Sequence, residues 1–238
     1  CFIMNVSIFI DPDNVNAVEY VIMAFDQGIE FSSILIIHNE SYSGKTKRIV
    51  TERTGGLYKF KNLYKILIDH KIPCYFIKSI NSKETIELLN FLNIDVLLLG
   101  GAEIINENVL EVPNVGILNC HPSDINKYRG CTNVEWAIYN DDRIFISCHL
   151  ITGEVDHGPL IHQEEFQYKP GITYYELRTE IIFAQARAMI NGVQKLLIGP
   201  CCEYEMPAKG RYMNVIKGVE FDKMIEKLSN STYCPKIS

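Results

Sequence analysis

The sequence has little that marks a nucleic-acid-binding, secreted or membrane protein. Its 238 residues contain 23 Lys and Arg against 29 Asp and Glu, so it lacks the basic excess that a phosphate backbone attracts. The longest early apolar run, 2–10, is interrupted by Asn5 and Ser7, has no basic residue before it and is followed by Asp11. We therefore expect neither a signal peptide nor a membrane span, and no nucleic-acid partner.

The eight cysteines lack CxxC spacing, and two of them, Cys201 and Cys202, are adjacent, which is unusual for a disulfide framework. Reduced thiols in a cytoplasmic enzyme are the simplest interpretation. The composition of 47% hydrophobic and 22% charged residues excludes a disordered or fibrous chain. The length favours one domain of catalytic size, 1–199, with a small C-terminal extension, 200–238.

The first half of the chain alternates apolar blocks with helix-like stretches, as βαβ units do. Because the block at 95–99 is almost entirely apolar, it suits a central parallel strand buried on both faces. We therefore predict an α/β fold, Rossmann-like, with a mostly parallel sheet. The expected strands are 4–10, 33–38, 74–77, 95–99 and 116–120, and the expected helices are 15–27, 57–69, 82–93 (capped by Ser82) and 106–110.

The pattern changes in the second half. Two extended runs, 144–151 and 159–167, are joined by a loop with glycines and predict a hairpin. A long helix follows over 173–197, with Thr173 and Glu176 in the spacing of a capping box. Beyond it, 201–238 holds a short amphipathic helix at 221–228 and is too small to fold alone.

Polar side chains gather where the strand at 116–120 should end, with Leu118 as its last residue. Asn119 and His121 occupy alternate positions, so they can project the same way at the carboxyl edge of the sheet. An amide and an imidazole there could stabilise an oxyanion. A structural role, with Asn119 capping a turn and His121 meeting a backbone carbonyl, is equally open.

A second polar group lies in the hairpin loop, where Gly153 and Gly158 flank Asp156. The glycines would let a carboxylate approach a strand end, although Asp and Gly are also ordinary turn residues. An Asp near His121 could orient the ring and raise its pKa. The pairing of the two segments favours a catalytic site over a simple turn.

Three other chemistries fit the sequence less well. Zinc sites use closely spaced ligands on motifs such as HExxH, which is missing around His121, His149, His157 and His162. His149, inside an apolar strand, suits a structural role. The segment 43–46 ends like a P-loop but has Asn39 where the motif needs glycine. Cys120 should face away from His121, which argues against a thiol nucleophile.

Five ordered segments together resemble the folate-dependent formyltransferases. The resemblance spans roughly residues 4–198, and the strand at 95–99 with 100–110 is similar to the segment before that family's catalytic strand. The five segments are Asn119-Cys120-His121-Pro122-Ser123, Tyr128-Arg129-Gly130, Trp136-Ala137-Ile138, Ser147-Cys148-His149 and Asp156-His157-Gly158-Pro159.

The resemblance implies a Rossmann-like fold, 10-formyltetrahydrofolate as formyl donor, and Asn119, His121 and Asp156 as the catalytic trio. In the mechanism that it implies, Asp156 keeps His121 charged while Asn119 and the imidazolium stabilise the oxyanion. The implied donor contacts are Gly100, Gly101, Ala102, Glu103, Ile104, Gly153, Glu154 and Val155. The expected acceptor contacts are Lys78, Asn81, Ser123, Tyr128, Arg129 and Gly130, and for Lys78 and Asn81 a solvated loop is equally open.

Within the family, the Arg-Gly and Trp-Ala-Ile segments are similar to those of the sugar N-formyltransferases. The loop 11–14 has two Asp where the purine-pathway enzyme has a glycine-rich phosphate loop, and 39 residues cannot supply the extra domain of methionyl-tRNA formyltransferase. We therefore expect a nucleotide-linked amino sugar as acceptor, a role in lipopolysaccharide biosynthesis, and a homodimer joined through the tail. The alternatives are another amine acceptor, hydrolysis of the formyl donor, or a non-catalytic folate-binding module.

Overall fold

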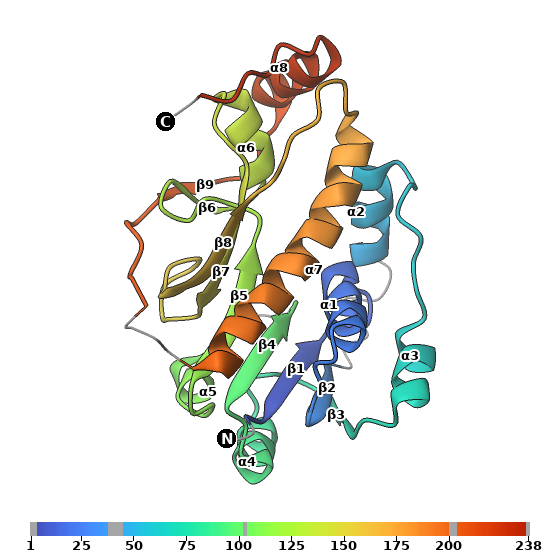
Figure 1. Ribbon diagram of the computed structural model, residues 1–238, viewed down its shortest axis with the longest axis vertical. Helices are drawn as coiled ribbons and strands as arrows, with labels where there is room; N and C mark the ends of the chain where they lie inside the picture. The colour runs from blue at the N-terminus through green and yellow to red at the C-terminus, as the bar shows by residue number, and fades with distance from the viewer. Residues whose placement is uncertain (1–3, 38–44, 102–103, 200–203, 237–238) are drawn as a thin grey trace.

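The computed structural model describes residues 4–37, 45–101, 104–199 and 204–236, and in these residues a seven-stranded sheet forms the centre (Figure 1). The strand order is β3-β2-β1-β4-β5-β7-β8. The first five of these strands pair in parallel, while β7 and β8 form an antiparallel hairpin at one end. The α/β fold with a mostly parallel sheet and a hairpin is therefore confirmed. The strands are β1 (Val6–Ile10), β2 (Ser33–Ile37), β3 (Cys74–Ile77), β4 (Val96–Gly100), β5 (Gly116–His121), β7 (Phe145–Leu150) and β8 (Leu160–Glu165).

Helices cover both faces of this sheet, and a two-stranded sheet lies beside it (Figure 1). The described helices are α1 (Val15–Asp26), α2 (Lys45–Thr54), α3 (Leu63–His70), α4 (Lys83–Leu92), α5 (Glu107–Leu110), α6 (Asn133–Tyr139), α7 (Tyr174–Ile198) and α8 (Gly218–Ser229). The small parallel sheet joins β6 (Tyr128–Gly130) to β9 (Arg211–Met213).

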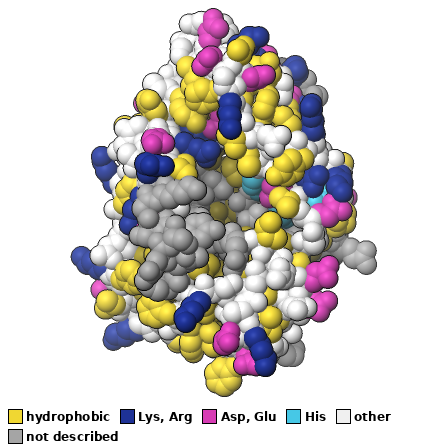
Figure 2. Space-filling view, turned by 180° about the vertical axis from the view of Figure 1, so that it is seen from behind, with side chains coloured by type: hydrophobic (Ala, Val, Ile, Leu, Met, Phe, Trp, Pro, Cys, Tyr) yellow, Lys and Arg dark blue, Asp and Glu magenta, His cyan; other side chains and the backbone are white. Residues whose placement is uncertain are grey.

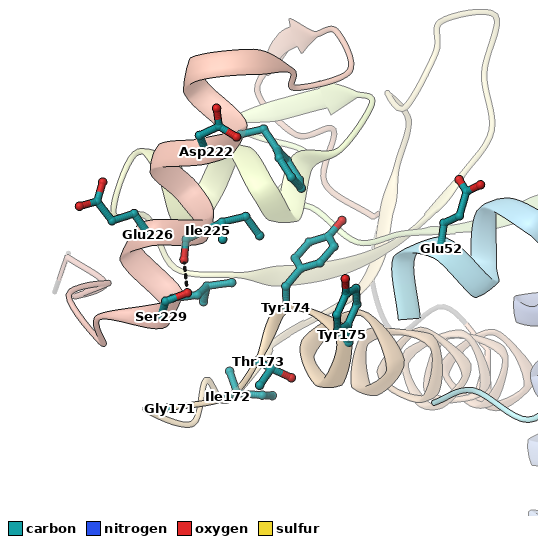
Figure 3. Close-up of a pocket in the computed structure, with 12 residues that line it drawn as sticks. Glu52, Gly171, Ile172, Thr173, Tyr174, Tyr175, Asp222, Ile225, Glu226 and Ser229 are labelled. Carbon is teal, nitrogen blue, oxygen red and sulfur yellow. Dashed lines mark hydrogen bonds between the residues drawn. The ribbon is translucent and has the colours of Figure 1, made fainter. Parts of the chain in front are cut away.

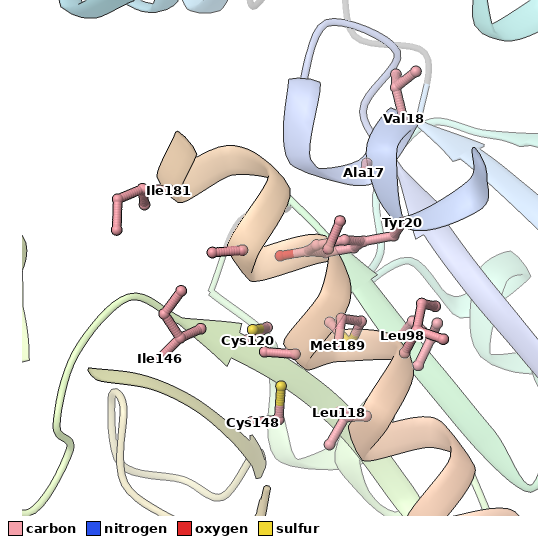
Figure 4. Close-up of a cluster of buried hydrophobic side chains, with 14 of the residues drawn as sticks. Ala17, Val18, Tyr20, Leu98, Leu118, Cys120, Ile146, Cys148, Ile181 and Met189 are labelled. Carbon is pink, nitrogen blue, oxygen red and sulfur yellow. The ribbon is translucent and has the colours of Figure 1, made fainter. Parts of the chain in front are cut away.

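The long helix α7 lies across one face of the sheet beside α1. Met189 of α7 is buried in one cluster with Leu98 of β4, Leu118 of β5 and Cys148 of β7 (Figure 4). The helix lies close enough to β5 for the side-chain amide of Gln185 to donate to the carbonyl of Cys120 at 3.1 Å. This face of β5 is therefore buried against α7.

The opposite face of the sheet has its own core. Phe9 of β1, Leu97 of β4 and Ile117 of β5 are fully buried there against Leu89 of α4 and Val109 of α5. Since side chains alternate along a strand, the residues two and four positions after Ile117 project on this same face.

Two expectations about local structure were wrong. The helix expected over 57–69 begins only at Leu63, because Asn62 caps it by accepting from the backbone of Lys65. The strand β5 continues to His121, one residue beyond the expected range 116–120 and three beyond Leu118, since β7 pairs with it through that residue. A cross-strand partner thus carries the strand through the polar segment.

The described part of the C-terminal segment packs beside α6. The side-chain N–H of Trp136 donates to the carbonyl of Asn214 at 2.8 Å, and Lys227 of α8 donates to the carbonyl of Tyr139 at 2.7 Å. The hydroxyl of Tyr233 donates to the carbonyl of Asp142 at 2.6 Å. Within the described ranges, no helix combines the length and the apolar character that crossing a bilayer requires.

The capping box predicted for α7 is present, and it sets the first prediction. Thr173 accepts from the backbone of Glu176 at 3.2 Å, and Glu176 accepts from the backbone of Thr173 at 2.8 Å. Thr173→Ala should therefore lower the free energy of unfolding by about 1 kcal/mol in urea titrations. Thr179→Ala removes a hydroxyl from the exposed interior of the same helix and should change it by less than about 0.5 kcal/mol. Equal losses in the two variants would contradict a role for the cap.

Candidate active site

The candidate site lies on the face of β5 that α7 does not cover. Asn119 and His121 are partly exposed, whereas Cys120 between them is buried against α7, where its thiol donates to the carbonyl of Gln185. The predicted alternation is thus confirmed, and Cys120 is held away from the site. Seen from behind, the molecule has a hollow near the middle of this face, with histidine side chains at its edge (Figure 2).

A buried histidine orients Asn119. His149 of β7 is directly opposite Asn119 in the antiparallel ladder, and the side-chain amide of Asn119 lies 3.4 Å from His149 Nε2. His149 Nδ1 lies 3.0 Å from the carbonyl of Leu150, which can only accept, so the proton is on Nδ1 and Nε2 accepts from Asn119. One amide N–H of Asn119 is thereby fixed, and the other is left for a ligand.

Burial keeps His149 uncharged. The ring is 1% exposed, and burial lowers the pKa of His149 from 6.5 to about 4, with the nearby His121 acting in the same direction. The sequence interpretation of His149 as structural therefore missed its contact with Asn119. The polar position opposite Asn119 could have been found only from the register of the hairpin.

His121 and Asp156 converge as predicted. His121 Nε2 lies 3.6 Å from Asp156 Oδ2, a distance for an ion pair rather than a hydrogen bond. The same carboxylate oxygen accepts from the backbone N–H of Gly130 at 2.9 Å. Asp156 has a φ of 47°, a left-handed conformation that Asp tolerates better than most residues. The loop between β7 and β8 thus delivers the carboxylate to the end of β5.

Burial of the ring acts against the expectation that Asp156 keeps His121 charged at neutral pH. Burial lowers the pKa of His121 below 6.5, and the opposing effects of the Asp156 charge and the Gly130 carbonyl only partly offset it. A neutral imidazole can take up a proton, whereas an imidazolium cannot. His121 therefore suits a general base better than a permanently charged oxyanion ligand.

Sequence reasoning missed Asn133, the first residue of α6. Its side-chain Nδ2 lies 2.8 Å from His121 Nε2 and donates to the carbonyl of Gly130 at 3.3 Å. Asn133 is 3% exposed, so its amide is part of the buried surroundings of the imidazole. It follows Arg129-Gly130 closely in the chain, but nothing in the sequence shows that α6 begins against β5.

The residues expected to contact an acceptor are mostly engaged elsewhere. Ser123 is buried and donates to the carbonyl of Tyr128 at 2.7 Å, while the Tyr128 hydroxyl donates to Asp142. Arg129 donates to the carbonyls of Val155 at 2.9 Å and Gly210 at 2.8 Å. These contacts give Ser123 and Tyr128 structural roles.

Arg129 and Gly130 hold the loop that carries Asp156. Arg129 ties Val155 to the C-terminal segment, and the N–H of Gly130 binds the Asp156 carboxylate. Gly130 has a φ of 86°, and a Cβ there would lie 2.5 Å from the carbonyl of Met213. The two residues therefore hold Asp156 in place, and their contact with an acceptor stays a prediction.

Lys78 and Asn81 follow β3, a strand that is four positions from β5 in the sheet, or about 19 Å at the usual spacing. Asn81 nevertheless reaches the loop after β4, because its amide donates to the carbonyl of Ile104 and accepts from the backbone of Asn106, each at 2.8 Å. Lys78 is exposed. Asn81 thus fixes the loop after β4, and contact of either residue with an acceptor stays a prediction.

The described residues expected to contact the donor lie on two loops, one after β4 and one between β7 and β8. On the first loop, Gly101 has a φ of 82°, and a Cβ there would lie 2.0 Å from the side chain of Asn14. Ile104 is 81% exposed. Ala102 and Glu103 lie outside the described residues. Gly101 and Ile104 follow β4, the neighbour of β5, at the carboxyl edge where ligands of such sheets bind.

On the second loop, the Glu154 carboxylate pairs with Lys209 at 2.5 Å, which lowers its pKa. Val155 is half exposed, although its carbonyl is taken by Arg129. At Gly153 the nearest atom to an added Cβ is 3.9 Å away. There is therefore space beside Gly153, whereas the Glu154 side chain and the Val155 carbonyl are already bonded to neighbouring residues.

A pocket of about 910 Å³ is separate from the trio. It lies between the start of α7 and α8, with Tyr174 and Tyr175 in the middle and Glu52 of α2 on the far side from α8 (Figure 3). Asn119, His121 and Asp156 do not line it. Among the residues with described positions, no group of three or more His, Cys, Asp or Glu side chains could hold a metal ion.

Comparisons with known proteins show which family the sequence and the fold resemble. Residues 4–193 match the formyl transferase family. The methionyl-tRNA formyltransferase of Thermotoga sp. (strain RQ2) is 30% identical over 168 residues, covering 68% of this chain and 54% of that protein. The chain therefore spans about half the length of this curated relative.

Solved structures share the fold. The phosphoribosylglycinamide formyltransferase from Bacillus halodurans has a TM-score of 0.60 and 22% identity, covering 82% of this chain and 96% of that one. A sugar N-formyltransferase from Shewanella sp FDAARGOS_354 has a TM-score of 0.60 and 14% identity, covering 93% of this chain and 86% of that one. Both similarities confirm the Rossmann-like architecture.

The neutral state of His149 makes folding stability depend on pH. Because burial lowers its pKa from 6.5 to about 4, the unfolded chain binds a proton in this window that the folded chain does not. The contribution is complete above pH 6.5 and is lost as the pH falls toward 4, by about 2 kcal/mol between pH 7.5 and 5. Urea titrations at both pH values should show that His149→Phe reduces this loss, whereas His70→Gln, which removes an exposed histidine, does not. An unchanged pH dependence in His149→Phe would contradict the buried neutral state.

Proposed function

Because the chain belongs to the formyl transferase family, we propose that it moves a formyl group from 10-formyltetrahydrofolate to the amine of a nucleotide-linked amino sugar. The observation that carries the proposal is the meeting of an oriented amide, a neutral imidazole and a carboxylate at the end of β5. Asn119 has one N–H left for a carbonyl oxygen, and His121 can take up a proton. These groups fit acyl transfer to an amine.

The roles of the three side chains follow from their contacts. When bound, the folate donor supplies the formyl carbon and the nitrogen that departs from it. The free N–H of Asn119 donates to the formyl oxygen as negative charge develops there. His121 takes the proton released when the amine nitrogen bonds to that carbon, and returns it to the departing nitrogen. Asp156, 3.6 Å away, stabilises the imidazolium during the interval.

The residues of the loop after β1 favour an amino sugar rather than a phosphate monoester as the acceptor group that binds next to them. Asp11 lies two residues after Phe9, so it projects on the same face as Asn119, two strands or about 10 Å away. Asn14 caps α1 by accepting from Asn16 and Ala17 at 3.0 and 3.2 Å, which occupies donors that a phosphate would need. Carboxylates such as Asp11 accept from sugar hydroxyls and repel phosphate.

A direct assay tests the acceptor. The chain is incubated with 10-formyltetrahydrofolate and, in turn, dTDP-, GDP- and UDP-linked amino sugars, glycinamide ribonucleotide and methionyl-tRNA, and tetrahydrofolate and formate are measured. We expect tetrahydrofolate to form with an amino sugar and to depend on it. A reaction confined to the ribonucleotide or the tRNA would contradict the sugar assignment, and formate released equally without any acceptor would indicate hydrolysis.

Asn119→Ala should then lower the rate with the reactive acceptor by about two to three orders of magnitude, because one oxyanion donor is lost. A thermal melt checks that the variant is folded. Lys83→Ala is the matched control, since the Lys83 side chain is 86% exposed at the start of α4 and has no expected contact with donor or acceptor, and it should retain the full rate. Near-normal turnover in Asn119→Ala would remove Asn119 from the mechanism.

A further inference from the structure

The side chain of Asn133 faces the same imidazole nitrogen as Asp156. Its Nδ2 lies 2.8 Å from His121 Nε2, whereas the Asp156 carboxylate lies 3.6 Å from it. All three groups are largely buried, with Asn133 3% exposed and the side chains of His121 and Asp156 18% and 12% exposed. Of these two side chains, the neutral amide is therefore closer to the imidazole nitrogen than the carboxylate, and the Gly130 carbonyl is a further backbone neighbour of the ring.

An amide NH2 can only donate, so Nε2 must present its lone pair to it. The proton of the neutral ring then lies on Nδ1. Without Asn133, the carboxylate of Asp156 would favour the opposite tautomer, with a proton on Nε2 pointing toward Oδ2. We propose that Asn133 is a positioning residue that holds neutral His121 in the Nδ1–H tautomer and keeps Nε2 ready to receive a proton.

The oxygen of the Asn133 amide can serve as the hydrogen-bond acceptor once His121 is protonated. Among the described residues, Asn133 Oδ1 is buried and has no hydrogen-bond partner. Turning the amide by 180° breaks the long 3.3 Å bond from Nδ2 to the Gly130 carbonyl and brings Oδ1 to Nε2. Oδ1 then accepts from the new Nε2–H. This step rests on the proposed function, in which His121 takes a proton from the amine and returns it.

The tautomer can be measured without any substrate. We expect ¹⁵N-histidine NMR spectra at neutral pH to show His121 as the Nδ1–H tautomer in the native protein. In Asn133→Asp, which has nearly the same shape but only accepts, the ring should change to the Nε2–H tautomer or to imidazolium. A native ring already in the Nε2–H form would overturn the proposal, as would an Asp variant that keeps the native tautomer.

A matched variant separates positioning from folding. Asn140 lies just after α6 and donates its amide to the Tyr128 hydroxyl at 2.8 Å, so Asn140→Ala also removes a partly buried amide beside this helix. It should lower the melting temperature and leave the His121 tautomer native. A changed tautomer in Asn140→Ala would show that any loss at α6 has this effect and would overturn a specific role for Asn133.

With the reactive acceptor, Asn133→Ala should lower kcat about 10- to 100-fold with KM changed less than about twofold, because the loss concerns proton transfer. Asn133→Asp should move the acid limb of the pH profile to higher pH, since a carboxylate at Nε2 favours the charged ring. An Asn133→Ala enzyme with unchanged kcat would overturn the catalytic part. Should no acceptor react at all, the proposed function fails, while the tautomer measurement still decides the role of Asn133 in the resting protein.

Discussion

The register of β5 between its two neighbours is the constraint on which the site depends. β5 pairs in parallel with β4 at its start and antiparallel with β7 at its end, so it is held along its whole length. Leu118 and Cys120 consequently face α7, and Asn119 and His121 project from the opposite face of the sheet and stay partly exposed. A slip of one residue would bury the amide and the imidazole under α7 and expose the packing residues. The buried contacts of α7 therefore hold the face of the candidate site in place as well as the fold.

Burial controls the chemistry at that face more than charge does. Two histidines near one carboxylate might be expected to share a positive charge, yet burial lowers the pKa of both His121 and His149. The consequences differ because their partners differ. His149 bonds a carbonyl and the amide of Asn119, so it only orients. His121 meets Asp156 at 3.6 Å, so it can become charged when a proton arrives.

Much of the fold and the convergence of His121 with Asp156 were predictable, because alternating apolar blocks and a hairpin leave few topologies. The failures have physical causes. The apolar residues at 57–60 suggested a helix, but Tyr58 is buried and donates to Glu19 of α1. β6 and β9 are three-residue strands whose paired residues lie 83 positions apart in the sequence, which no local pattern reveals. Asn133 reaches His121 only because α6 starts against β5, a purely tertiary relation.

The central claim is that His121 reacts as a neutral base whose charged form Asp156 stabilises, and the pH dependence of formyl transfer tests it most directly. With a saturating amino sugar, the rate should be flat above neutral pH and fall on an acid limb below pH 6.5, because burial lowers the pKa of His121. Asp156→Asn removes the charge that raises this pKa, so the limb should move to still lower pH and the plateau should fall by about two orders of magnitude. A rate that instead declines as the pH rises through 6 to 8 would mean that the imidazolium is required, and would contradict the account.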